Sequence, residues 1–345
     1  MFKKILLIGF VFLLVLILWN HKLVSYGLAQ AKGQFTILWK ARHITEVLHD
    51  PQVADSIKAR IQLVQEIKQF AIDQIGVKPT NNYTTYYDQQ GKPILWVVTA
   101  CQPYELKNKE WSFPLIGTFS YKGFFNQERA IAEKAQLTNK GYDTGIRTTT
   151  AWSTLGYFKD PILSGFLSRS EGEIANTVIH ELTHGTVFVK DSLQFNENIA
   201  TFFGNKGAEA FLTQKYSPHS EEYQTYIDRM HDREIYTQHI LRGARKLDSL
   251  YHDHAFETLD EAEKQLQKKT MIRHIIHCAD TLSLREKPRY VKLFQRYLQP
   301  DSLPNNTFFM SYMRYRGNLN TLEEECNRQF AGDIKAYLQY LAEKY

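Results

Sequence analysis

The stretch that decides the organisation of this chain is residues 170–200, which read SEGEIANTVIHELTHGTVFVKDSLQFNENIA. Three apolar residues recur there at helical spacing, Ile174, Val178 and Leu182, which predicts an amphipathic helix over 171–189. Ser170 followed by Glu173 is a capping-box pattern, so the helix is expected to begin at Glu171. After a break at 190–192, a second helix is expected from about Phe195. The segment therefore predicts two consecutive helices within 171–215.

The first helix carries an H-E-x-x-H pattern at His180, Glu181 and His184. Histidines one turn apart share a helix face, so both imidazoles can bind one tetrahedral Zn²⁺. Glu181 lies beside that face and is the candidate general base. Glu197 on the second helix is the candidate third ligand, which leaves the fourth position open to water. The competing interpretation of Glu197 is a solvated carboxylate favoured by the helix dipole.

Composition limits the remaining classes of function. The 345 residues are 43% apolar, enough to bury a sizeable core. The net charge of +5 is small and dispersed, so no nucleic-acid partner is expected. Cys101, Cys278 and Cys326 form no C-x-x-C pair, so any metal must be held by histidine and carboxylate. Such sites accept several first-row ions. The oligomeric state is not predicted.

The amino terminus carries an apolar run over residues 5–19, preceded by Lys3 and Lys4. Residues 1–24 are expected to be a signal-anchor or a cleaved signal peptide, and a buried core helix is the third alternative. We favour the uncleaved anchor. Lysines ahead of the run predict that residues 25–345 lie outside the cytoplasm, in the periplasm or cell envelope, tethered to the membrane.

The pattern along the rest of the chain changes from strands to helices. A helical period over 57–71 stops at Gly76, and runs of β-branched and aromatic residues follow at 94–101, 113–125 and 144–154. We expect a small antiparallel sheet within about 77–160, with 144–153 a candidate edge strand beside the substrate. Helical periods then fill 220–345, including one last helix through Leu322 and Leu341. This segregation predicts an α+β fold with one catalytic domain over 25–345.

Several linked motifs accompany the metal pattern. They are a segment over 30–48 with Gly33-Gln34, Trp111-x-Phe113-Pro114, Tyr121-x-Gly123-x-Phe125, Gly141-Tyr142-Asp143, and Ser153 to Phe158 ahead of Asp160-Pro161. With them, the chain resembles the bacterial putative zinc aminopeptidases, a gluzincin-type group in which an H-E-L-x-H helix precedes F-N-E-x-x-A. The resemblance covers about residue 25 to the end. It implies a gluzincin-like fold, one Zn²⁺ on His180, His184 and Glu197, and Glu181 as general base.

Other parts of a peptidase site are less defined by the sequence. An oxyanion donor is expected beside the metal, and Tyr157 and Tyr315 are the candidates, although packing or surface roles also suit them. An aminopeptidase must pair the substrate's free amine, yet no G-x-M-E-N segment occurs; Asp143, Asp160 and Glu173 are the candidates. The leading hypothesis is an aminopeptidase acting on short peptides. The alternatives are an envelope endopeptidase acting on a protein partner and a catalytically silent peptide-binding module.

Overall fold

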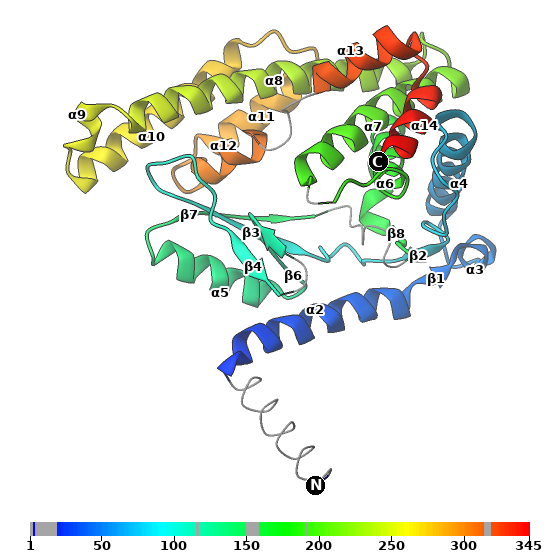
Figure 1. The fold of residues 1–345 in the computed structure, drawn as a ribbon, viewed down its shortest axis with the longest axis horizontal. Helices are drawn as coiled ribbons and strands as arrows, with labels where there is room; N and C mark the ends of the chain where they lie inside the picture. The colour runs from blue at the N-terminus through cyan, green and yellow to red at the C-terminus, as the bar shows by residue number, and fades with distance from the viewer. Residues whose placement is uncertain (1–2, 4–18, 115–116, 150–158, 191, 314–318) are drawn as a thin grey trace.

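Helices make up most of the chain in the computed structural model, which describes residues 3, 19–114, 117–149, 159–190, 192–313 and 319–345 (Figure 1). The helices before the metal motif are α2 (His21–Lys40), α3 (Ile44–His49), α4 (Asp55–Phe70) with a π-turn at Ala71–Ile75, and α5 (Gln127–Thr138). Those from the motif onward are α6 (Glu171–His184), α7 (Leu193–Lys215), α8 (Glu221–Tyr251), α9 (His254–Glu257), α10 (Glu261–Cys278), α11 (Lys287–Tyr297), α12 (Asn306–Met313), α13 (Leu319–Phe330) and α14 (Ile334–Lys344). Short 3-10 turns occur at Ser164–Phe166, Ala279–Thr281 and Pro300–Ser302.

The strands within the described residues gather in three small sheets. One has the order β6-β3-β7, with β3 (Trp96–Cys101) paired antiparallel to both β6 (Lys122–Phe124) and β7 (Asp143–Thr148). Another joins β1 (Arg42–His43), β2 (Thr85–Tyr87) and β8 (Ile162–Leu163), and its β2–β8 pair is parallel. The third is the hairpin of β4 (Trp111–Phe113) and β5 (Gly117–Phe119). The strand β7 is thus an edge strand of its sheet.

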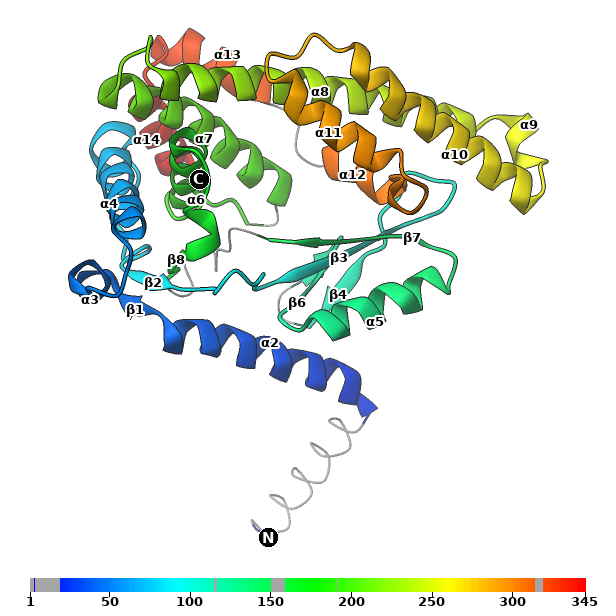
Figure 2. The same cartoon turned by 180° about the vertical axis from the view of Figure 1, so that it is seen from behind.

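Helices cover both faces of the β6-β3-β7 sheet. Figures 1 and 2 show α5 against one face and α12 against the other, and contacts of both helices with β3 and β7 agree. The Asp143 carboxylate of β7 accepts a hydrogen bond from Lys268 of α10 at 2.6 Å, and Lys268 is only 3% exposed. This buried ion pair joins the sheet to the helices above it.

The two helices of the metal motif lie in the main hydrophobic core. α6 and α7 pack against each other and α4, with α13 and α14 beside them; buried members include Ile174, Val178, Ile179 and Phe203. A separate core lies farther along the long helix α8, where α10, α11 and α12 pack against it. α8 therefore carries residues of both cores, from Tyr226 in the first to Tyr251 in the second.

The predicted α+β fold class is wrong, because the described chain is mostly helical and its sheets are small. The run over 113–125 contributes only the three-residue strands β4, β5 and β6, with a glycine at φ +92° (Gly117) starting β5. The next residues are helical because Asn126 caps α5, accepting the N–H of Arg129 at 2.8 Å. The sheets are also not purely antiparallel, since β2 and β8 run parallel.

The expected N-terminal membrane segment is likewise not supported. Within the described part of the chain, no helix is both long enough and apolar enough to cross a membrane. Residues 4–18, which hold nearly all of the apolar run, lie outside the described residues.

Helix lengths also differ from the sequence prediction in two places. The helix over 57–71 is confirmed as α4 with its π-turn, ending at Gly76 at φ +85°. The prediction of a single last helix is wrong, because Ala331 at φ +52° and Gly332 at φ +81° separate α13 from α14. A left-handed pair of residues ends a right-handed helix, so the apolar period continues across a break in the backbone.

Candidate metal centre

The first ligand helix begins as its sequence predicts. Ser170 donates its backbone N–H to the Glu173 carboxylate at 3.2 Å and its hydroxyl at 2.7 Å, completing the capping box of α6. The helix ends at His184, five residues before the predicted end. Asn196 holds the following loop, because its side-chain amide donates to the carbonyl of Val189 and accepts its N–H, each at 2.8 Å. The entry of α7 is thereby fixed relative to the end of α6.

Two glycines of α7 allow this helix to lie unusually close to α6. A Cβ on Gly204 would lie 2.9 Å from the Asn176 backbone oxygen and 3.1 Å from the His180 Cβ. A Cβ on Gly207 would lie 2.8 Å from the side chain of Ile179. The missing side chains therefore set the distance between the two ligand helices.

Three donor atoms meet where these helices face each other. The Nε2 atoms of His180 and His184 lie 3.2 Å apart. One carboxylate oxygen of Glu197 lies 3.6 Å from His180 Nε2, and the other lies 3.5 Å from His184 Nε2. Their side chains are 20%, 4% and 26% exposed, respectively. Within the described residues, these three form the one group of His, Cys, Asp and Glu side chains compact enough to hold a metal ion.

The spacing of the donors matches the edges of a metal coordination tetrahedron. Ligand atoms about 2.1 Å from a tetrahedral ion lie about 3.4 Å from one another. The observed edges of 3.2, 3.5 and 3.6 Å agree with that value. The donor set of two imidazoles and one carboxylate is also a known set for catalytic zinc. His180, His184 and Glu197 can therefore hold one divalent ion.

The electrostatics of the group favour a cation. Burial and the neighbouring His180 lower the pKa of His184 to about 4, so this imidazole is neutral at pH 7, as a metal ligand must be. Burial alone would lower the pKa of His180, but its hydrogen bond to Glu197 and the charges of Glu181 and Glu197 raise it above the ordinary value. The same carboxylates that attract a proton to His180 attract a divalent ion.

Comparison with known proteins gives one match. The family model described as Putative aminopeptidase matches residues 25–343. The chain belongs to this family. The family name indicates a hydrolase that acts on peptides. No curated protein and no solved structure matches the chain significantly.

Glu181 directly follows His180 on α6, next to the group of three donors. Tyr83 is a neighbour that the sequence did not single out: its side chain is 7% exposed, and its backbone has φ +63° and donates to the Asp160 carbonyl at 2.8 Å. Burial and the charges of Glu181 and Asp160 raise the pKa of Tyr83 well above 10, so its hydroxyl keeps its proton. With 20 tyrosines in the chain, no local pattern could have selected this one.

The remaining predicted site residues divide into two groups. The candidate oxyanion donors Tyr157 and Tyr315 lie outside the described residues. Of the candidate amine partners, Asp143 is paired with Lys268, and Glu173 is paired with Arg229 at 2.9 Å. Asp160 is 2% exposed and lies beside Tyr83.

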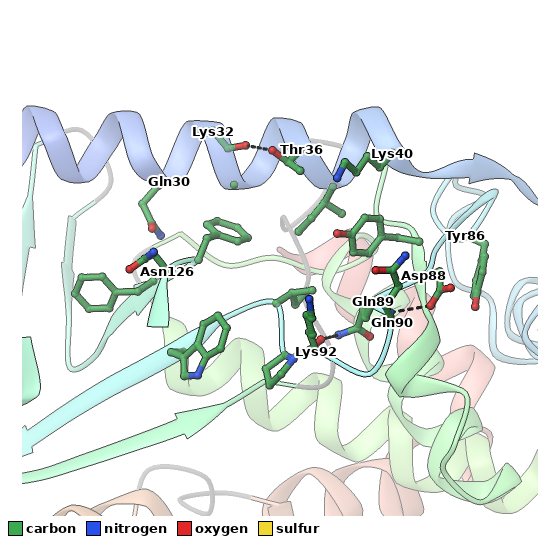
Figure 3. A pocket seen from close by; sticks show the side chains of 18 of the residues that line it. Gln30, Lys32, Thr36, Lys40, Tyr86, Asp88, Gln89, Gln90, Lys92 and Asn126 are labelled. Atoms are coloured by element: carbon green, nitrogen blue, oxygen red, sulfur yellow. Dashed lines mark hydrogen bonds between the residues drawn. The ribbon is translucent and has the colours of Figure 1, made fainter. Parts of the chain in front are cut away.

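Two cavities border the sheets. The larger, about 980 Å³, lies between α2 and the segment around Gln89, and the described residues that line it include none of the three ligands (Figure 3). The other, about 720 Å³, lies between β7 and the helices α8 and α12, and Thr201 of α7 lines it. Thr201 is one turn beyond Glu197, so this second cleft begins beside the ligand group.

Proposed function

We propose that this chain is a zinc-dependent aminopeptidase that hydrolyses short peptides, with His180, His184 and Glu197 as the zinc ligands. The observation that carries the proposal is the triangle of donor atoms with edges of 3.2, 3.5 and 3.6 Å. Its size suits a tetrahedral ion with one position left for water. The family assignment supports the peptidase part of the proposal.

Each residue of the group has a distinct role in this mechanism. A zinc ion bound there would polarise the peptide carbonyl and make water more acidic. Glu181 accepts the proton of the attacking water and passes it to the leaving amine. Burial and the charges of Glu181 and Asp160 keep the Tyr83 hydroxyl protonated, so it is an uncharged group that can donate a hydrogen bond at this site. The edge strand β7 offers free backbone groups with which an extended peptide can pair.

Endopeptidase activity is the second candidate, favoured by one observation. Asp143 and Glu173 already neutralise Lys268 and Arg229, so neither carboxylate is available to a substrate amine. Of the three carboxylates that the sequence suggested, Asp160 is the one left, and its side chain is buried, with the residue 2% exposed. If Asp160 does not serve, the cleavage site need not be near a free amino terminus.

Metal analysis combined with matched peptides tests the proposal. We expect about one zinc per chain and faster hydrolysis of peptides with free amino termini than of the same peptides acetylated. Equal rates on both would favour the endopeptidase. Glu181→Gln should retain zinc and lose at least about 100-fold in kcat, because general acid–base catalysis typically contributes that much. Wild-type turnover in this variant would refute Glu181 as the general base of both enzyme hypotheses. No turnover by the zinc-loaded wild type would instead leave the silent peptide-binding module.

A further inference from the structure

The cleft of about 720 Å³ beside the ligand group has a distinctive charge. Two arginines line it, Arg147 on β7 and Arg233 on α8, and the described lining residues include no carboxylate. Both arginines are exposed, and neither forms an ion pair with any other described residue. The Arg233 guanidinium lies 3.9 Å from the sulfur of Met230. Threonines from β3, α8 and α12 also line the walls, at Thr99, Thr237 and Thr307. The hydroxyls of Thr237 and Thr307 already donate to the Arg233 carbonyl and the Asn305 side-chain oxygen, each at 2.7 Å, so towards the cleft they can act only as acceptors.

This lack of partners contrasts with another arginine-rich surface of the same molecule. Near the start of α6, Arg229 binds both Glu173 and Glu286, and Arg60 lies 3.5 Å from Glu171. Those arginines are neutralised within the fold. The two arginines of the cleft are not, so their charges are available to a ligand.

The cleft begins close to the proposed metal centre, so a bound substrate can extend into it. Thr201 lies on the same face of α7 as Glu197, about 6 Å farther along the helix. An extended peptide covers that distance with about two residues. Two cations repel a free ammonium group, so the amino-terminal side of a substrate does not suit this cleft.

We infer that the cleft holds the leaving-group side of the peptide, and that Arg147 and Arg233 bind a carboxylate carried beyond the cleaved bond. The inference rests on the proposed function and names its substrate class. The carboxylate is either the α-carboxylate of a short peptide or the side chain of Asp or Glu, and both present the same planar group to a guanidinium. Short or acidic peptides are then better substrates than neutral ones.

Matched peptides test this inference. One sequence is prepared with a free carboxyl terminus, as the amide, and as the amide with an Asp near its end. For the zinc-loaded wild type we expect kcat/KM for the free acid to exceed that for the plain amide by about tenfold, mostly through KM. If the Asp amide recovers the rate, the side chain is a second source of the carboxylate; if it does not, the α-carboxylate alone is bound.

Variants assign the effect to the two arginines. Arg147→Gln and Arg233→Gln should each reduce the ratio of acid to amide, while Arg147→Lys, which keeps the charge, should retain part of it. Arg245→Gln is the matched control, because Arg245 is an exposed arginine on α8 outside the cleft. An acid-to-amide ratio of one in the wild type, or an unchanged ratio in both glutamine variants, overturns the inference.

Calorimetric binding separates this inference from the proposed function. If the wild type cleaves no peptide, the proposed function fails, and binding of the free-acid and amide peptides to wild type and to Arg147→Gln still decides the present question. Tighter wild-type binding of the acid, lost in the variant, supports the carboxylate site. Equal binding of acid and amide refutes it.

Discussion

Replacing Gly204 with alanine tests whether the close approach of α6 and α7 builds the metal centre. The new Cβ would lie 2.9 Å from the Asn176 backbone oxygen, where ordinary contact requires about 3.4 Å or more. A backbone oxygen in a helix cannot turn aside as a side chain can. The helices must therefore separate by about 0.5 Å at this point.

The expected size of the effect follows from the donor distances. Glu197 lies two turns before Gly204 on α7, and the built Cβ would also press on the His180 Cβ, at 3.1 Å. Moving the carboxylate by about 0.5 Å stretches one edge of the triangle from 3.6 Å to about 4 Å, beyond the tolerance of about 0.2 Å for a metal ligand. We expect zinc affinity to fall about 10- to 100-fold, as when supporting residues of a metal site are changed.

The free energy of unfolding of the variants provides an independent test. Alanine in place of glycine inside a helix contributes about 1 kcal/mol, whereas overpacking costs about 1–3 kcal/mol. Gly204→Ala should therefore be neutral or destabilised by up to about 2 kcal/mol. Gly27→Ala is the control, since no described atom lies within 4 Å of its built Cβ on α2, and it should be stabilised by up to about 1 kcal/mol.

Zinc affinity would be measured by competition with a chromophoric chelator, and unfolding by denaturant titration. If Gly204→Ala binds zinc as tightly as wild type and is stabilised as much as Gly27→Ala, the close packing of the ligand helices does not set the metal geometry. Weakened zinc affinity in both variants would instead indicate a general effect of added side chains.

Three further predictions concern the metal and the ion pairs. Chelation should lower Tm, since zinc at 100 times its Kd stabilises the folded chain by about 2.7 kcal/mol, and an unchanged Tm would argue against metal binding. Asp143→Asn should cost about 3–5 kcal/mol in urea unfolding because it leaves the Lys268 ammonium buried, whereas Glu323→Gln in a more exposed pair should cost less than about 1 kcal/mol. Burial alone would raise the pKa of Glu173, but the Ser170 hydrogen bonds and nearby arginines lower it below 4.5. Ionised Glu173 therefore stabilises the folded chain above its ordinary pKa of 4.5, and this stabilisation is lost as the pH falls through the lower pKa of the folded state. Glu173→Gln should flatten the acid limb of a Tm–pH curve.

The ligand group could be predicted from the sequence because each of its signals is local. A capping box, an apolar helical period and two histidines four residues apart determine one face of α6 without reference to the rest of the chain. Glu197 could be predicted because the connection between α6 and α7 is short, which limits how far its carboxylate can lie from the two histidines. The assignment of Glu181 as general base and of zinc as the metal stays a prediction.

The residues that the sequence could not place depend on distant segments. Tyr83 comes near Glu181 through a turn about 100 residues earlier in the chain, and its left-handed backbone has no glycine to indicate it. Arg147 and Arg233 lie on a strand and a helix that share no sequence pattern. The fold class was predicted wrongly for a related reason: aromatic and β-branched residues over 113–125 predicted a long strand, but turns and the α5 cap limit this run to three-residue strands.

The metal centre and the arginine cleft both include residues of α7, but only the cleft includes residues of the sheet. Zinc affinity and the preference for a carboxylate can therefore be changed separately. On α7, Thr201 lies between the proposed ligand Glu197 and the packing residue Gly204, so a shift of this helix alters both the proposed metal centre and one wall of the cleft. Arg147 instead depends on β7, which the Asp143–Lys268 pair joins to α10. A change in that ion pair should thus weaken the preference for a carboxylate while leaving zinc affinity intact, whereas Gly204→Ala should change both. If changing the Asp143–Lys268 pair also lowers zinc affinity, the sheet and the helices α6 and α7 move as one body.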